Sequence, residues 1–292
     1  MRADMPKRTR RRETGVACLF LLPSLAGLIG MFLGPTADVI RRSFYSAMGN
    51  SFVGTGNYQT VLENESFRLA LGNTGRFLIV CIPLLLLVSL LVALLLYRQK
   101  RLQNLFRTTY LLPLVIPVTS VVLIIQTVFQ KNGLLSALCA TFGNAPVDWL
   151  NSEYAFVVLV VCYLWKNLGY HVVLWMAGLS AIPDALYEAA RVDGAGEARC
   201  FFSITLPQLR PTLFMTAVLA LINSFKVFRE AYLVAGQYPH TSIYMLQHVL
   251  SNWFTNLDMH KISAAAVLLM GVILLVVLTV QALSGAKREE SA

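Results

Sequence analysis

The run FLIVCIPLLLLVSLLVALLLY, residues 77–97, decides the fold class of this sequence. It contains no charged residue and has the length of the roughly 20 helical residues that cross the hydrocarbon core of a bilayer. Its apolar residues are almost continuous, without the spacing of an amphipathic helix or the alternation of a half-buried strand. The run is therefore interpreted as a transmembrane helix.

Five further blocks of the same kind extend this prediction to the whole chain. Of 292 residues, 57% are hydrophobic and only 13% charged, too few charges for the surface of a soluble domain of this size. The blocks also lack the alternation of barrel strands, so the sequence predicts an all-α membrane protein. The six expected spans are residues 15–39, 77–97, 110–129, 154–179, 212–234 and 262–283.

The positions of the basic residues predict the topology. The net charge is +9, and 15 of the 24 Lys and Arg residues lie in the two ends and the loops on one side, against 6 on the other. By the positive-inside rule both termini are expected in the cytoplasm. We expect a basic tail at 1–15, a permease domain at 16–284 and a second tail at 285–292. A secretory signal is the alternative for the basic start, but the apolar run is longer than a signal core.

Cysteine and histidine spacing predicts no catalytic or metal site. The five cysteines have no C-x-x-C spacing, and only Cys139 is expected on the outer face, so no disulfide framework is implied. The four histidines lack the spacing of a ligand set. We therefore expect no metal, no bound cofactor and no enzymatic activity. The charge distribution likewise argues for a membrane topology signal and against nucleic-acid binding.

A polar stretch between the fourth and fifth spans, residues 181–211, reads AIPDALYEAARVDGAGEARCFFSITLPQLRP. Pro183 followed by an acidic residue predicts a helix start, and Gly194 predicts its end. A second short helix is expected at about 196–204, ending before Pro207. The stretch is predicted to form helix, tight turn and helix at the cytoplasmic surface.

The first of these helices has the features of a docking surface. Ala189 and Ala190 leave one face nearly flat, so another protein's backbone can approach, and Glu188 adds a charge at its edge. The alternative is a structural helix, re-entrant or lying at the membrane interface, and composition alone favours this alternative. Residue types alone leave both readings open.

The spacing of this loop resembles that of a known family. Its residues fill the pattern E-A-A-x-x-D-G-A…F…I-x-L-P-x-x-x-P and resemble the EAA loop of binding-protein-dependent ABC permeases. The resemblance implies a type I importer permease fold in which the loop is a coupling helix seated in a groove of a cytoplasmic ATPase. The positions that it assigns to ATPase coupling are Glu188, Ala189, Ala190, Asp193, Gly194, Ala195, Leu206 and Pro207.

Other fragments extend the resemblance over nearly the whole chain and favour the carbohydrate branch of the family. Such permeases pair with a second permease subunit, with two copies of an ATPase that binds ATP and Mg, and with an extracytoplasmic solute-binding protein. The fragments similar to sugar permeases of the maltose and glycerol-phosphate type are Gly56-Asn57-Tyr58, Phe106-Arg107-Thr108, Trp165-x-x-Leu168-Gly169-Tyr170, Ala177-Gly178-Leu179 and Ser224-Phe225-Lys226-Val227-Phe228.

Charged residues inside the spans indicate where solute could pass. Lys226, Arg229 and Glu230 in the fifth span are costly in lipid, so they are expected to face protein or water. Lys226 and Glu230 are four residues apart and could form a structural pair on one helix face. Lys166 in the fourth span is a further intramembrane cation, for which a packing role and solute contact are both open.

The resemblance implies that the solute pathway is lined by segments of the third, fourth and fifth spans. Trp165 suits stacking on a sugar, although a buried Trp is more often part of a core. Several of the other positions are aliphatic, which leaves open whether this subunit or its partner recognises the solute. The expected pathway residues are Leu114, Val118, Trp165, Leu168, Gly169, Asn223, Ser224, Lys226 and Val227.

The function predicted from these patterns is the permease subunit of an ABC importer for a sugar or related solute. An ABC permease for another polar solute, such as glycerol 3-phosphate, is the nearest alternative. A secondary transporter would not need the EAA loop and is expected to show an inverted pair of broken helices. A membrane enzyme would need a convergent catalytic set, which the sequence lacks.

Overall fold

The computed structural model describes residues 19–47, 51–97, 112–113, 115–143 and 145–283. The expected tails at 1–15 and 285–292 and the segment 98–111 after the second span lie outside this part. Within it, every regular element is a helix, apart from one isolated antiparallel bridge between Tyr45 and Phe52. The prediction of an all-α protein is confirmed for the described residues.

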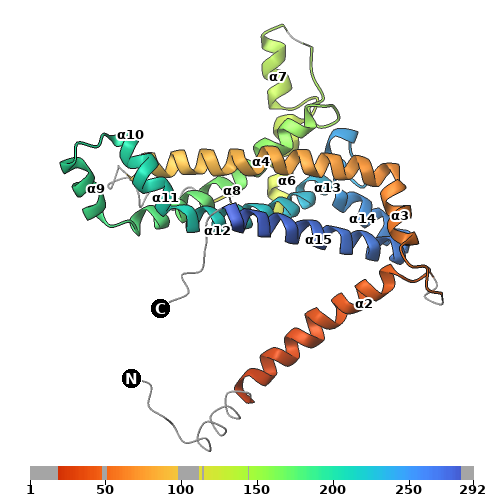
Figure 1. Ribbon diagram of the computed structural model, residues 1–292. Helices are drawn as coiled ribbons and strands as arrows, with labels where there is room; N and C mark the ends of the chain where they lie inside the picture. Colours follow the sequence, from red (N-terminus) through yellow and green to blue (C-terminus); the bar gives the residue numbers. More distant parts are fainter. Residues whose placement is uncertain (1–18, 48–50, 98–111, 114, 144, 284–292) are drawn as a thin grey trace, which may run out of the picture. The chain divides into compact units, whose positions relative to one another are not determined.

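Six helices of the described part are long and apolar enough to cross a membrane, as expected. The longest single helices are α4 (Glu65–Tyr97), α8 (Ala155–Ser180) and α15 (Met259–Leu283), shown in Figure 1. The six spans are Leu19–Ser43, Glu65–Tyr97, Val118–Thr141, Ala155–Ser180, Arg210–Ala235 and Met259–Ala282.

The third span differs most from its predicted bounds, 110–129. Its helix α6 (Val118–Phe129) begins only after Pro117, whose extended backbone has ψ 143°. Proline has no N–H to donate and disfavours the helical conformation of the residue before it. The span then turns at Gly133 into α7 (Leu134–Thr141), which points away from the other helices in Figure 1. A Cβ at Gly133 would meet backbone oxygens at 2.8 Å, so only glycine fits this turn.

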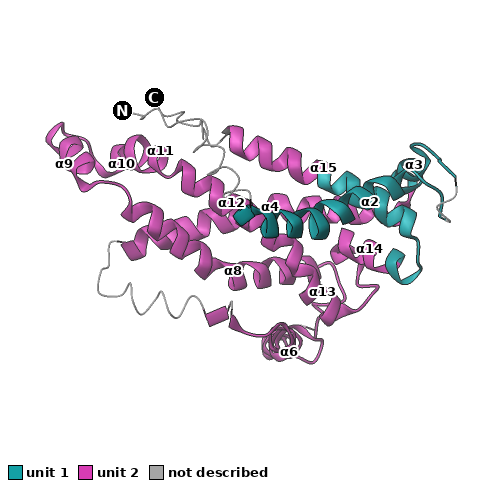
Figure 2. Cartoon of the chain, turned by 90° about the horizontal axis from the view of Figure 1, so that it is seen from below, with its two compact units in different colours: residues 1–63, 253–270 teal, residues 64–252, 271–292 magenta. Residues whose placement is uncertain are grey.

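The chain divides into two compact units, coloured separately in Figure 2. The smaller unit comprises residues 1–63 and 253–270 and includes α2 (Gly34–Ser43) and α3 (Gly56–Glu63). Here the buried Asn57 donates through Nδ2 to the carbonyl oxygens of Ser43 and Tyr45, at 2.9 and 2.8 Å. Asn57 therefore joins α3 to the end of the first span.

The larger unit, residues 64–252 and 271–292, is built around α4, α8 and α12 (Arg210–Ser224). The hydroxyl of the buried Tyr163 on α8 donates to the Ala220 carbonyl oxygen on α12 at 2.7 Å. Trp175 Nε1 on α8 donates to Ser89 Oγ on α4 at 3.0 Å. Such bonds between helices contribute on average about 0.6 kcal/mol in membrane proteins and fix which helix faces meet.

The fifth span is interrupted between α12 and α13 (Phe228–Ala235) by one turn of 3-10 helix, Phe225–Val227. A 3-10 turn has about 3.0 residues per turn instead of 3.6, so it rotates the following side chains relative to an unbroken α-helix. Beyond α13 the chain forms a short helical turn, Thr241–Ile243, and then α14 (Leu246–Thr255).

Candidate functional site

The loop between the fourth and fifth spans begins with α9 (Asp184–Val192). Pro183 precedes the helix in an extended conformation, Asp184 lies in its first turn and Arg191 in its last, which suits the helix dipole at both ends. The helix ends at Gly194, with φ 78°. The Ala195 N–H donates to the Ala190 carbonyl oxygen at 2.9 Å and the Gly194 N–H to that of Arg191 at 3.0 Å, which is the pattern of a Schellman cap.

After this turn the chain stays helical further than expected. α10 (Glu197–Cys200) runs into a π-helical turn, Phe201–Thr205, and then into α11 (Leu206–Gln208). The expectation that the second helix ends before Pro207 is wrong. Pro207 lies within the first two positions of α11, where a missing N–H leaves no hydrogen bond unmade.

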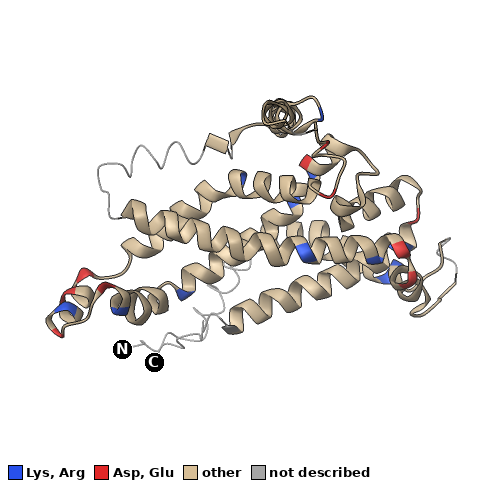
Figure 3. Cartoon of the chain, turned by 90° about the horizontal axis from the view of Figure 1, so that it is seen from above, with Lys and Arg blue, Asp and Glu red and all other residues tan. Residues whose placement is uncertain are grey.

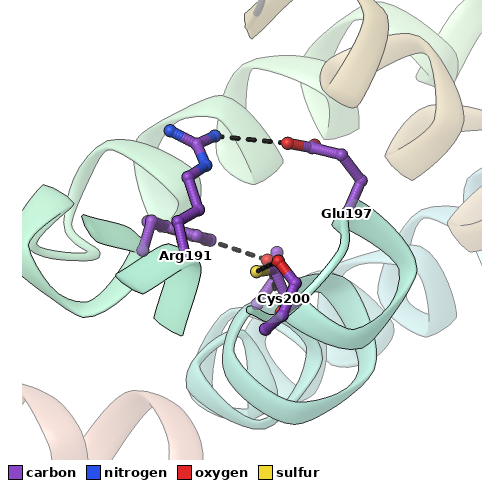
Figure 4. A network of polar contacts seen from close by, with 6 residues as sticks. Arg191, Glu197 and Cys200 are labelled. Carbon is purple, nitrogen blue, oxygen red and sulfur yellow. Dashed lines mark hydrogen bonds and ion pairs between the residues drawn. The ribbon is translucent and has the colours of Figure 1, made fainter. Parts of the chain in front are cut away.

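One side of α9 is held against the rest of the loop. Tyr187, which is half-buried, shares a hydrogen bond of 2.9 Å between its hydroxyl and Thr205 Oγ1. Arg191 reaches Glu197 at 3.2 Å, as Figure 4 shows, but both side chains are more than 60% exposed. Exposed ion pairs contribute little stability, so the Tyr187 contact is the stronger anchor.

The other side of α9 is open, and α9 contains no buried residue. Glu188 and Ala189 are exposed, and Val192 has 88% of its surface exposed. Figure 3 shows acidic and basic residues gathered around α9 and α10. Glu188 also borders a cleft of about 310 Å³ on the side of α9 that carries Tyr187 and Arg191, and residues of α4 and α8 line this cleft as well. The predicted docking helix is thus a short, exposed element with an apolar residue and a charge on its surface.

A second candidate site lies among α6, α8 and the interrupted fifth span, in the larger unit. It is a pocket of about 280 Å³ whose polar lining comes from α8, the end of α12, the 3-10 turn and the start of α13. Four of the predicted pathway residues border it: Val118, Asn223, Lys226 and Val227. The 3-10 turn therefore lies in the wall of the pocket.

The ion pair in this pocket is not the one that spacing suggests. Glu230 lies against Lys166 of α8, and only 4% of the Glu230 side chain is exposed. Lys226 instead donates through Nζ to Asn223 Oδ1 at 3.0 Å. The suggested pairing of Lys226 with Glu230 is therefore wrong, because the two residues lie on either side of a change in helical twist.

The remaining predicted pathway residues do not line this pocket. Trp165 is 40% exposed, Leu168 packs against the core, and Gly169 is buried. Ser224 is buried and its hydroxyl donates to the Leu221 carbonyl oxygen at 2.6 Å. Leu114 lies outside the described residues.

Sequence analysis left several pocket residues out of the predicted pathway. Lys166, Arg229 and Glu230 had been recognised as charges inside spans but were not assigned to the pathway. Charges of opposite sign on two different spans were the signal that could have joined them. The aliphatic and aromatic lining residues Ile116, Val121 and Tyr163 carry no such signal.

No group of three His, Cys, Asp or Glu side chains close enough to hold a metal ion occurs among the residues that the structure describes. His248 on α14 is fully buried beside Phe228 and Tyr244, with ring centroids 4.8 and 5.6 Å away. Burial lowers the pKa of this histidine to about 4. It accepts a hydrogen bond from the Met245 N–H and shows no arrangement for proton transfer to a substrate.

Six spans, a polar pocket beside an interrupted helix and an exposed loop define a helical membrane permease. Residues 85–289 match the family described as the binding-protein-dependent transport system inner membrane component, and the chain belongs to that family. It is accordingly a membrane subunit of an ABC importer that works with a solute-binding protein.

This chain aligns with its characterised relatives over nearly their full length. The sulfoquinovosyl glycerol transport system permease protein SmoG of Agrobacterium fabrum is 30% identical, over 91% of this chain and 90% of its own. The trehalose/maltose transport system permease protein MalF of Thermococcus litoralis is 28% identical, over 93% and 94%. The sn-glycerol-3-phosphate transport system permease protein UgpA of Escherichia coli is 31% identical, over 92% and 93%.

A solved structure has the same fold. A chain of the bacterial ABC transporter that imports the acidic polysaccharide alginate matches with a TM-score of 0.80 at 21% identity, over 96% of this chain and 99% of its own. The predicted ABC importer permease fold is thereby confirmed.

Proposed function

We propose that this chain forms part of the import pathway for a sugar or sugar derivative, with α9 as its contact to the ATPase. The observation that carries the proposal is the placement of both features on one continuous segment. The α9 to α11 loop leads into α12, and α12 leads into the turn that lines the pocket. A displacement of the loop therefore acts directly on the wall of the pocket.

The solutes of the relatives support the sugar class. Two of their names specify carbohydrate solutes, sulfoquinovosyl glycerol and trehalose or maltose, whereas the third specifies sn-glycerol 3-phosphate, the solute of the alternative. In this chain the solute path includes Val118, Asn223, Lys226 and Val227 at the pocket. The other members of the proposed path are Leu114, Trp165, Leu168, Gly169 and Ser224.

The arrangement of the complete transporter follows from the same proposal. A second permease subunit completes the path, and two ATPase subunits bind ATP and Mg at the cytoplasmic face. Both termini of this chain and α9 lie on that face. The ATPase contact uses Glu188, Ala189, Ala190, Asp193, Gly194 and Ala195, with Leu206 and Pro207 supporting the loop.

The test is to express the chain with its second permease subunit, ATPase and binding protein, and to compare Glu188→Lys with the wild type. A reversed charge in a desolvated protein interface costs about 2 to 5 kcal/mol, so ATPase retention on membranes should fall at least 30-fold. Glu153→Lys reverses an exposed charge outside the loop and serves as the control. Full retention of the ATPase and full uptake by Glu188→Lys would show that α9 is not the coupling element.

A further inference from the structure

The pocket beside the 3-10 turn carries an excess of positive charge. Lys166, Lys226 and Arg229 line it together with a single carboxylate, Glu230. Glu230 is already paired with Lys166. Two cations of the pocket therefore have no counter-charge in the part of the chain that the structure describes.

These two cations are also the accessible ones. Lys226 and Arg229 are exposed, whereas the side chains of Lys166 and Glu230 are only 20% and 4% exposed. The Lys226 ammonium donates to one neutral oxygen, Asn223 Oδ1, and can make two further hydrogen bonds. The Arg229 guanidinium offers a fork of five N–H groups. The accessible wall of the pocket is thus rich in donors and positively charged.

The buried wall of the pocket contains a hydrogen-bond acceptor that lacks a donor in the described part of the chain. Glu230 Oε2 is buried and has no hydrogen-bond partner among the described residues. A buried acceptor without a partner is unfavourable, so this part of the pocket lacks a donor. A sugar hydroxyl can donate a hydrogen bond here and accept one elsewhere.

We propose that the solute received by this pocket carries an oxyanion, a carboxylate, sulfonate or phosphate, bound between Lys226 and Arg229, while a hydroxyl group faces Glu230. The inference rests on the proposed function, because it takes the pocket to be part of the solute path. Guanidinium and ammonium groups form charge-assisted hydrogen bonds with oxyanions, and the guanidinium fork binds two oxygens at once. A neutral sugar would displace water from both cations on binding without supplying a counter-charge, which is unfavourable.

The test measures binding to the assembled transporter in nanodiscs, without the binding protein, so that only the membrane subunits select the solute. The probes are glucuronate, 6-deoxy-6-sulfoglucose and glucose 6-phosphate, with glucose as the neutral reference. We expect at least one of the three acids to bind at least 10-fold more tightly than glucose. The acid that binds best identifies the oxyanion.

Variants test whether the named cations cause this preference. Lys226→Gln and Arg229→Gln should each reduce the preference for the acid over glucose at least 5-fold. Lys131→Gln removes an exposed lysine outside the pocket and should leave the preference unchanged.

Three results would overturn the inference. The first is equal binding, or equal absence of binding, of glucose and all three acids; the second is an unchanged preference in both variants. The third is loss of the second permease subunit from either variant with the acid preference intact, which would assign these cations to the subunit interface. A transporter that keeps its ATPase contact and imports only a neutral sugar would refute the oxyanion but leave the proposed function standing.

Discussion

Glu230 and Lys166 bring opposite charges from two different spans into one wall of the pocket. Lys166→Met leaves the buried Glu230 carboxylate without its counter-charge, which should destabilise the subunit by about 3 to 5 kcal/mol. Replacing both partners, as Lys166→Met with Glu230→Leu, removes the stranded charge and should restore most of that stability. The fraction of monodisperse protein after heating in detergent measures the effect.

The control for this pair is Lys131→Met, which removes an exposed lysine and should change little. If the double variant is as unstable as Lys166→Met alone, the two side chains do not stabilise each other. In that case the cycle of single and double variants assigns the loss of stability in Lys166→Met to lost packing of the methylene groups of Lys166.

His248 predicts a pH dependence of the segment around α14. Burial lowers its pKa to about 4, whereas a state that opens this segment has the ordinary value of about 6.5. Stability from the neutral ring is therefore present above pH 6.5 and is lost as the pH falls from 6.5 towards 4. Corrected for intrinsic exchange, amide protection in α14 should fall about 30-fold between pH 8 and pH 5.

His248→Gln should abolish this fall, because glutamine does not titrate in that range. Burial raises the pKa of neighbouring Tyr244 above its ordinary value, so Tyr244 leaves the comparison unchanged. Equal pH dependence in the variant and the wild type would exclude His248 as its origin.

At the scale of single residues, the sequence located the intramembrane charges but not their partners. Lys226 and Glu230 have the spacing of a pair on an α-helix, yet the 3-10 turn changes the angle between them. The partner of Glu230 lies on α8, and contacts between helices follow from packing that hydropathy does not encode. Opposite charges on two spans could have suggested the pairing of Lys166 with Glu230, but only the packing of α8 against the fifth span establishes it.

Among the elements, α9 depends on the left-handed turn at Gly194, with φ 78°. Valine at this position strains the backbone by about 1 to 3 kcal/mol and should disturb the end of α9. No atom lies within 4 Å of a Cβ placed there, so the effect is conformational and not a steric clash. We expect Gly194→Val to insert normally while binding-protein-stimulated ATP hydrolysis falls at least 10-fold.

Gly236 provides a matched control. It has φ 76°, equally open space around a Cβ, and a position after α13, away from the loop. Because Gly236 has ψ −163°, in a region that essentially only glycine adopts, Gly236→Val should strain the chain at least as much as Gly194→Val but leave stimulated hydrolysis near the wild-type rate. Similar losses in both variants would indicate general destabilisation and not coupling through α9.

The limits of sequence analysis at this scale come from proline. The six apolar blocks predicted six spans, because the length of an apolar run is set by the bilayer. The block at 110–129 includes Pro117, which sets the start of α6, while Pro207 was expected to end a helix that it instead enters. The effect of a proline depends on whether its missing N–H falls on a hydrogen-bonded position, and hydropathy does not report this.

For the whole molecule, the topology prediction is tested with reporter fusions. The distribution of basic residues predicts that both termini lie in the cytoplasm. Fusions at Gly49, Asn144 and Asn252 should be active outside the cytoplasm, and fusions at Gln103, Gly196 and Ser291 inside it. A cytoplasmic reading at Asn144 would remove the third or the fourth span from the transmembrane set.

The position of α12 has a consequence for how this transporter can evolve. Its 15 residues, about 22 Å of helix, separate the Glu188 loop from the turn that carries Lys226. If the turn and α9 have the roles proposed above, substitutions around the turn change the solute without altering the proposed ATPase contact. In that proposed arrangement, a change of solute and a change of ATPase contact are separable events, because they affect residues at opposite ends of α12.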